Sequence, residues 1–200
     1  MRQAGLASEW LKHFAVVLDE TDCPPNIKDG AWTTLLGDML ERVGEGMGCY
    51  VVRNRKSRSG KRRHPDTGEH LGIDVMFFDA KEYDSQPVNK YGKDPLIRPK
   101  AAIELENDDS FDKIAYCLWK VLCVRAPLKV LICYQTGLHH VRALRKHLKD
   151  VMEKGRLATG DKAEVLVLVG DEAQLESAEW GEYFTVWTWS GSDWDAIRLA

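Results

Sequence analysis

The sequence predicts an α/β fold in which helices flank a mixed central β-sheet. Segments with apolar residues at helical spacing alternate with short segments that are either alternating or continuously apolar. Helices and strands in such an order form a sheet covered by helices. The length of 200 residues matches one domain, and no repeat or linker divides the chain, so we expect a single domain over 1–200.

Two helices are expected first, because apolar side chains recur every three or four residues and so share one side of a helix. In the first helix, predicted over 9–18, the apolar side is formed by Trp10, Phe14, Val17 and Leu18. The apolar side of the second, predicted over 29–43, consists of Leu35, Leu36, Met39 and Leu40. A Pro-Pro pair follows the first helix and several glycines follow the second, which are typical helix ends.

Three strands are expected next. β-branched and aromatic residues predict strands over 49–53 and 70–81, and the turn signals between them predict a hairpin. Three prolines within 84–99 predict an extended loop. The third strand is predicted over 100–106, where apolar and acidic residues alternate at the end.

The remaining chain alternates helix and strand. A helix capped by Asp109 or Ser110 is expected to end before Pro127, and a basic amphipathic helix is expected over 138–154. Continuous apolar runs predict strands covered on both faces, and an alternating segment predicts an edge strand at the end. These strands are expected at 128–134, 163–170 and 182–190, respectively.

Composition excludes several classes of protein. An apolar content of 44% and a charged content of 30% are typical of a soluble folded chain. No signal-peptide core or membrane-spanning run is present, so we expect a cytoplasmic protein with no membrane partner. The five cysteines lack the spacing of a disulfide framework or a zinc site. We expect Cys117, Cys123 and Cys133 to be reduced core residues.

The positive charge is concentrated in one segment, although the net charge is −3. Seven of the 28 Lys and Arg residues lie between positions 53 and 63. This segment is either a solvated loop or a surface that contacts the phosphates of a nucleic acid. The candidate nucleic-acid-binding residues are Arg53, Arg55, Lys56, Arg58, Lys61, Arg62 and Arg63.

Acidic residues interrupt two of the expected strands. Glu104 and Glu106 are two residues apart in a strand and therefore share a face. Asp74 interrupts the preceding strand, and the three carboxylates meet if the two strands pair. Carboxylates that converge repel one another unless a cation neutralises them, and a hard divalent ion does so through oxygen ligands. Alternatively, the two glutamates lie on the solvated face of an edge strand.

These acidic positions resemble the signature of the PD-(D/E)XK, or restriction-endonuclease-like, nuclease superfamily, in which an Asp on one strand precedes E-x-K on the next. "GID" supplies Asp74 and "IELE" supplies Glu104 and Glu106, so glutamate replaces the motif lysine. The resemblance covers about residues 30–135, because the family core of helix, three antiparallel strands, helix and strand has the expected order. Residues 136–200 would extend the sheet.

The resemblance implies residues for the missing functions. Some members carry glutamate at the third position, and in others the lysine function has moved to the following helix, which makes Lys113 the first candidate and Lys100 a weaker one. Glu41 matches the acidic residue that many members place on the helix before the first strand, with Asp38 and Glu45 as rivals.

The resemblance also implies a function. Asp74, Glu104 and Glu106 would bind Mg²⁺ or Mn²⁺, and the protein would hydrolyse phosphodiester bonds of nucleic acid, with DNA favoured by analogy. Glu106 or Lys113 would orient the attacking water. Many members form homodimers, which this chain would then share. Because the motif lysine is missing, the alternative is a catalytically inactive protein of this fold that binds nucleic acid or a protein partner.

Other polar and aromatic residues allow two interpretations each. His139 and His140 diverge on a helix and are expected at the surface rather than at zinc. Three tryptophans near the end could stack on bases, but packing is the expected use; they are Trp187, Trp189 and Trp194. Gln135 ends a strand, where some relatives place a polar residue near the metal.

Overall fold

The computed structural model describes residues 5–22, 29–54, 72–85, 97–155, 162–172 and 180–199. Within these ranges seven strands form one sheet in the order of the chain. The strands are β1 (Cys49–Arg53), β2 (Val75–Asp79), β3 (Ala101–Glu106), β4 (Leu128–Gln135), β5 (Glu164–Asp171), β6 (Phe184–Trp189) and β7 (Trp194–Ile197). The helices are α1 (Leu6–Asp19), α2 (Asp29–Gly46), α3 (Ala80–Asp84), α4 (Phe111–Cys123), α5 (Leu138–Gly155) and α6 (Trp180–Tyr183).

The sheet is mixed, as predicted. β1, β2 and β3 are antiparallel neighbours, β3, β4 and β5 are parallel, and β5, β6 and β7 are again antiparallel. The parallel pairs need crossover connections, which α4 and α5 provide. The expected order of helix, three strands, helix and strand is present as α2, β1, β2, β3, α4 and β4, with the short α3 inserted after β2.

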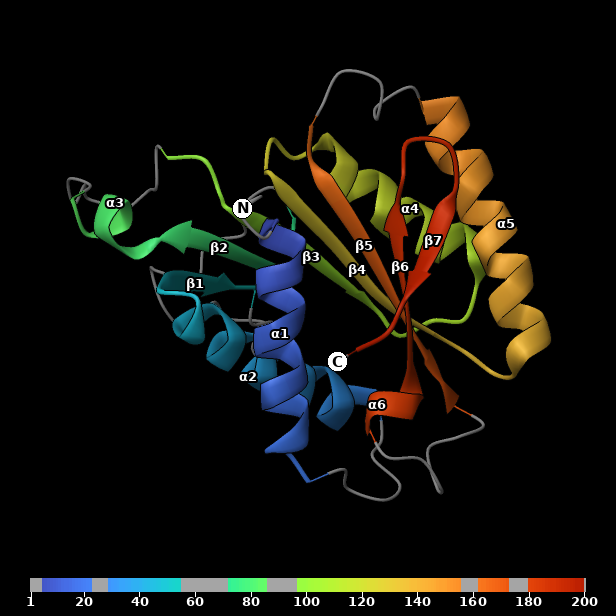
Figure 1. Cartoon of the computed structure of the whole chain (residues 1–200), viewed down its shortest axis with the longest axis horizontal. Helices are drawn as coiled ribbons and strands as arrows, with labels where there is room; N and C mark the ends of the chain where they lie inside the picture. Colours follow the sequence, from blue (N-terminus) through green and yellow to red (C-terminus); the bar gives the residue numbers. More distant parts are fainter. Residues whose placement is uncertain are drawn as a thin grey trace.

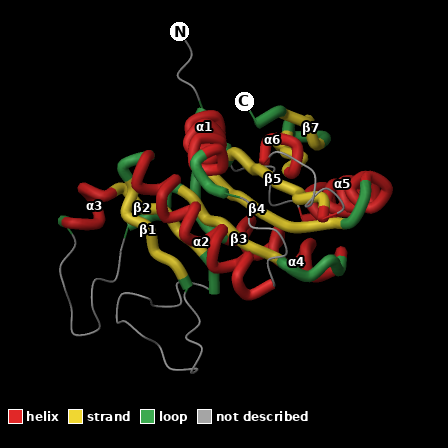
Figure 2. Tube along the Cα trace, turned by 90° about the horizontal axis from the view of Figure 1, so that it is seen from below, coloured by secondary structure: helices red, strands yellow, loops and turns green. Residues whose placement is uncertain are grey.

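Helices cover both faces of the sheet. α1 and α2 lie on one face and α4 and α5 on the other (Figure 1), and α1 and α4 lie on opposite sides of the strands in Figure 2. Adjacent residues of β3 show why: Ile103 packs with the α1 and α2 core, whereas Ala102 packs with the α4 and α5 core. Both side chains are fully buried. β3 is therefore a central strand.

Three sequence predictions are corrected. The strand predicted over 70–81 ends at Asp79, because the Asp79 side chain accepts hydrogen bonds from the backbone N–H groups of Lys81 and Glu82 and caps α3. The segment 182–190 does not form an edge strand, because β7 pairs with β6. Cys123 is exposed rather than part of the core.

Several other predictions are confirmed. β1 has the predicted bounds, and α4, β4, α5 and β5 lie where their periodicity placed them. Trp187 and Trp194 are buried against the α4 and α5 face, as expected of packing residues.

A helix that spans a membrane needs a certain length and hydropathy. Within the part of the chain that the structure describes, none of the helices meets both requirements.

Candidate functional site

Asp74, the residue directly before β2, lies opposite Glu104 of β3. Val75 pairs with Ile103, so extending the antiparallel register by one position brings Asp74 beside Glu104. The Asp74 backbone N–H donates to Glu104 Oε1 at 3.2 Å, and the Leu105 N–H donates to Asp74 Oδ2 at 3.0 Å. These reciprocal bonds hold the two carboxylates at the end of β3, on the α4 face of the sheet.

Glu104 is buried, with 1% of its surface exposed. Burial, together with the charge of Asp74, raises the pKa of Glu104 to about 7, although the hydrogen bond and the charge of Lys120 oppose the rise. A carboxylate that is kept from water and beside a second acid is costly to ionise. The alternative of two glutamates on a solvated edge strand is therefore wrong for Glu104.

Lys120 supplies the positive charge that faces Glu104. Its Nζ lies 2.7 Å from Glu104 Oε2, and its side chain is 21% exposed. Burial lowers the pKa of Lys120, but the hydrogen bond and charge of Glu104 outweigh it and the pKa is raised. The ammonium therefore stays charged beside the two acids.

Lys120 was not among the residues predicted from the sequence. Its only sequence signal is its place three residues after Cys117, at the margin of the apolar stripe of α4. Lys113, which lies two turns earlier, is exposed and pairs with Asp108. Lys100 pairs with Asp79 at 2.8 Å, and its backbone N–H donates to Phe77 O, at the opposite end of β3. The structure thus brings Lys120, and neither predicted lysine, to Glu104.

Glu106 shares the face of Glu104 but has other partners. Its Oε1 accepts a hydrogen bond from the Asp108 N–H at 2.9 Å, and its Oε2 lies 3.3 Å from the Cys117 thiol. Burial and the nearby Glu104 charge raise the pKa of the Cys117 thiol, so it remains protonated and able to donate. Glu106 therefore anchors the turn into α4.

The donor atoms suit a hard divalent cation only in part. Within the described ranges, no group of three or more His, Cys, Asp or Glu side chains has the arrangement of a metal site. Mg²⁺, however, is usually held by one or two carboxylates and completes its shell with waters and substrate phosphate. Asp74 and Glu104 meet that requirement, and the unfavourable ionisation of Glu104 is what a cation would relieve. Glu106, as arranged, is not part of this pair.

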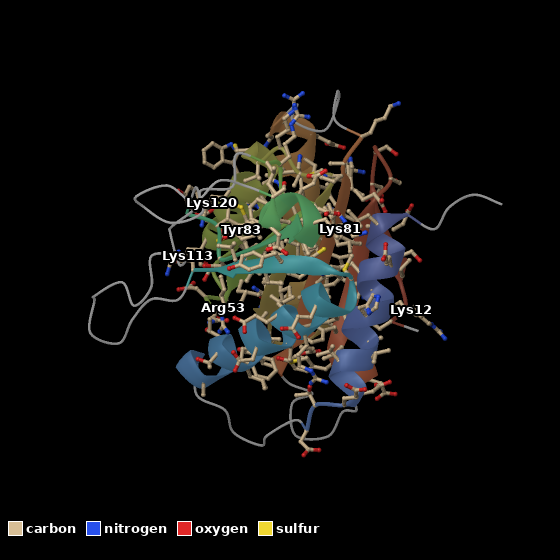
Figure 3. All side chains as sticks on the ribbon, turned by 90° about the vertical axis from the view of Figure 1, so that its left-hand side faces the viewer. Lys12, Arg53, Lys81, Tyr83, Lys113 and Lys120 are labelled. Atoms are coloured by element: carbon tan, nitrogen blue, oxygen red, sulfur yellow. The ribbon has the colours of Figure 1, made fainter. Side chains whose placement is uncertain are left out.

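Glu41 lies with Arg53 on the α2 side of the sheet. Arg53 Nη1 lies 2.6 Å from Asp38 Oδ1 and 3.7 Å from Glu41 Oε1, and its Nη2 donates to the backbone oxygens of Thr33 and Thr34. Arg53 pairs with Val75, which faces the α1 and α2 core, so its side chain is on the face opposite Asp74. In Figure 3 Arg53 lies towards α2, and Lys113 and Lys120 lie on the other side of the strands.

Arg53 therefore ties β1 to α2 through a side chain that is only 12% exposed. Of the rivals to Glu41, Asp38 belongs to the same ion pair and Glu45 is exposed near the end of α2. The other predicted nucleic-acid-binding residues lie outside the described residues: Arg55, Lys56, Arg58, Lys61, Arg62 and Arg63.

The remaining candidates lie apart from the acidic pair. The buried Gln135 side chain donates to the Asp109 backbone oxygen at 2.7 Å and so supports the turn before α4. His139 and His140 are exposed at the start of α5.

Comparisons with protein-family models, curated proteins and solved structures find no match for this chain. A function must therefore be argued from the acidic pair and its surroundings.

Proposed function

We propose that this protein is a metal-dependent nuclease that hydrolyses phosphodiester bonds of nucleic acid at the Asp74–Glu104 pair. The observation that carries the proposal is the position of these two carboxylates, one directly before β2 and one on β3, with the ammonium of Lys120 beside Glu104. DNA as the substrate, Mg²⁺ or Mn²⁺ as the ion and a homodimer as the assembly follow from the resemblance to PD-(D/E)XK nucleases.

Asp74 and Glu104 are the proposed ligands of the ion. Mg²⁺ bound there would polarise the phosphodiester and lower the pKa of an attacking water. The backbone bonds that hold the two carboxylates keep their spacing fixed before substrate arrives. Such preorganisation matters because phosphoryl transfer depends on positioning and charge more than on a covalent nucleophile.

Lys120 replaces Lys113 as the proposed electrostatic residue. The Lys120 ammonium, 2.7 Å from Glu104, would lie close to a phosphate bound by an ion at this carboxylate, and would stabilise the negative charge that develops in the transition state. Glu106, which is bound to Cys117 and Asp108, acts as a positioning residue for α4 and hence for Lys120. Glu41 is left out of the proposed site because it contacts Arg53 on the other face.

The test is Mg²⁺- or Mn²⁺-dependent cleavage of plasmid and of short labelled oligonucleotides. We expect Asp74→Asn and Glu104→Gln to abolish cleavage, and Lys120→Met to reduce it by a factor of about 10² to 10³, typical of losing one charge-stabilising group. Lys12→Met, which removes an exposed lysine of α1 on the other face of the sheet, is the control and should retain cleavage. Wild-type protein that degrades no nucleic acid with either ion, or Asp74→Asn protein that cleaves normally, would refute the proposal.

A second candidate is a protein of the same fold that binds nucleic acid without cutting it. The observation that favours it is the Lys120–Glu104 ion pair, which already neutralises the more buried acid. In that case Mg²⁺ would leave the melting temperature unchanged, while salt-sensitive binding of nucleic acid would persist. A metal-dependent rise in melting temperature that is lost in Asp74→Asn would exclude this candidate.

A further inference from the structure

Two exposed aromatic side chains lie beside the proposed site on α4. Tyr116 is 59% exposed and Trp119 is 47% exposed, whereas large apolar side chains elsewhere on the same helix, such as Leu118, are fully buried. The two rings stack on each other, with centroids 5.7 Å apart and planes inclined by 27°. The pair therefore presents an aromatic surface to water. Packing within the described residues does not explain why two large rings are exposed there.

The rings are connected to the proposed site through Lys120. Its ammonium lies 6.0 Å from the centre of the Tyr116 ring and 2.7 Å from Glu104, so it lies between the aromatic pair and the acids. On a helix, residues three and four apart are neighbours, so Tyr116 lies between Lys113 and Lys120 on the surface of α4. Figure 3 shows these two lysines on the same side of the molecule.

We propose that Tyr116 and Trp119 form a stacking platform for an unpaired base of the substrate. This inference rests on the proposed function and narrows it to nucleic acid with a single-stranded segment or a frayed end. A base in a duplex already stacks on its neighbours, so its faces are covered, whereas an unpaired base has a free face for a ring. The flanking lysines match the negative backbone of the strand that carries this base.

The mixture of charge and rings favours nucleic acid over a protein partner. A patch for a protein would be expected to have a charge-depleted centre, but here the ammonium of Lys120 lies 6.0 Å from the centre of the Tyr116 ring and Lys113 lies one turn away on the helix. Alternating cations and rings are what a strand of alternating phosphates and bases requires.

The experiment measures binding of a labelled oligothymidylate by fluorescence anisotropy, with Ca²⁺ in place of Mg²⁺. The comparison strands are an abasic strand of the same length and a blunt duplex. We expect a Tyr116→Ala, Trp119→Ala protein to bind oligothymidylate about 5- to 150-fold more weakly, the range expected for losing one stacked base. Binding of the abasic strand and of the duplex should not change.

Two controls separate stacking from folding. Tyr116→Phe, Trp119→Phe protein keeps the rings and should keep most of the affinity. Leu138→Ala removes an exposed apolar side chain from α5, 60% exposed, and should change nothing. The alanine variant should also keep the wild-type melting temperature, because both side chains are largely in water.

The inference is overturned if the alanine variant binds oligothymidylate as the wild type does, if it loses abasic and duplex binding equally, or if the wild type binds no strand. Cleavage of the same strands in Mg²⁺ is scored separately. Cleavage that persists with no effect of the ring substitutions would refute the platform and leave the proposed nuclease standing. Ring-dependent binding without cleavage by the wild type would refute the nuclease and leave the platform standing.

Discussion

The raised pKa of Glu104 predicts how the stability of the metal-free protein depends on pH. In the folded protein the pKa of Glu104 is about 7, against its ordinary value of 4.5, because burial and the Asp74 charge disfavour the ionised form. The pKa of Glu104 is higher in the folded protein than in the unfolded chain. The stabilisation that Glu104 contributes to the folded protein is therefore fully present below about pH 4.5 and is lost as the pH rises through about 7. The protein is therefore expected to be less stable at pH 8 than at pH 5.

The size of the effect follows from the two pKa values. A difference of about 2.5, multiplied by about 1.36 kcal/mol per pKa unit, gives about 3 kcal/mol lost between pH 4.5 and 8. Glu104→Gln removes the titration and keeps the shape of the side chain. The difference in unfolding free energy between wild type and variant should therefore shift by about 3 kcal/mol across this range, in favour of the variant at high pH.

The assay is urea unfolding of both proteins in EDTA at pH values from 5 to 8. Subtracting the unfolding free energy of one protein from that of the other cancels the effect of the histidines, which both proteins share. Asp79, Asp108 and Asp193 have lowered pKa values and change stability only at more acidic pH. Glu153→Gln, an exposed glutamate on α5, is the control and should give parallel pH profiles. Parallel profiles for Glu104→Gln as well would refute the account of Glu104.

Three further predictions follow from named contacts. Mg²⁺ should raise the melting temperature more at pH 8 than at pH 5, because binding requires the ionised Glu104, and Asp74→Asn should remove the effect; an equal shift at both pH values in calorimetry would contradict this. Gly37→Ala should cost about 1 to 3 kcal/mol in urea unfolding, because a Cβ at that position would lie 1.9 Å from Cζ of Arg53, and a neutral result would show that the guanidinium moves easily. Asp79→Ala should lower the free energy of unfolding in urea because it removes the cap of α3, whereas Asp79→Asn should retain most of the wild-type stability; a loss that asparagine shows as well would assign the effect to the Lys100 ion pair instead.

The spacing of apolar residues predicted most of the fold, because in the central strands and helices this pattern continues over many residues. β4 and β5 are runs of apolar residues that only a strand covered on both faces can bury, and α4 has a stripe that repeats over three turns. The errors lie where short-range contacts decide the outcome. α3 depends on a single capping carboxylate, and β7 has only one buried residue, Trp194, so neither leaves a periodic pattern.

The candidate site was predictable on the strands and not on the helix. The sequence predicted that Asp74, Glu104 and Glu106 would meet if the two strands paired; the observed antiparallel register brings Asp74 to Glu104, whereas Glu106 has other partners. Which lysine of α4 reaches them depends on how far the helix extends back along β3 and how it is rotated, and the sequence specifies neither. Lys113 and Lys120 are seven residues apart, two turns on the same side, so spacing alone cannot distinguish them.

Glu106 and Lys120 belong to one arrangement around α4. Glu106 accepts hydrogen bonds from the Cys117 thiol and the Asp108 N–H. A lysine at position 106 has no acceptor and would lose both contacts. Because Lys120 follows Cys117 by three residues, the contact that anchors Cys117 also directs Lys120 to Glu104. Glu106 therefore anchors α4, and α4 brings the ammonium of Lys120 to the acidic pair.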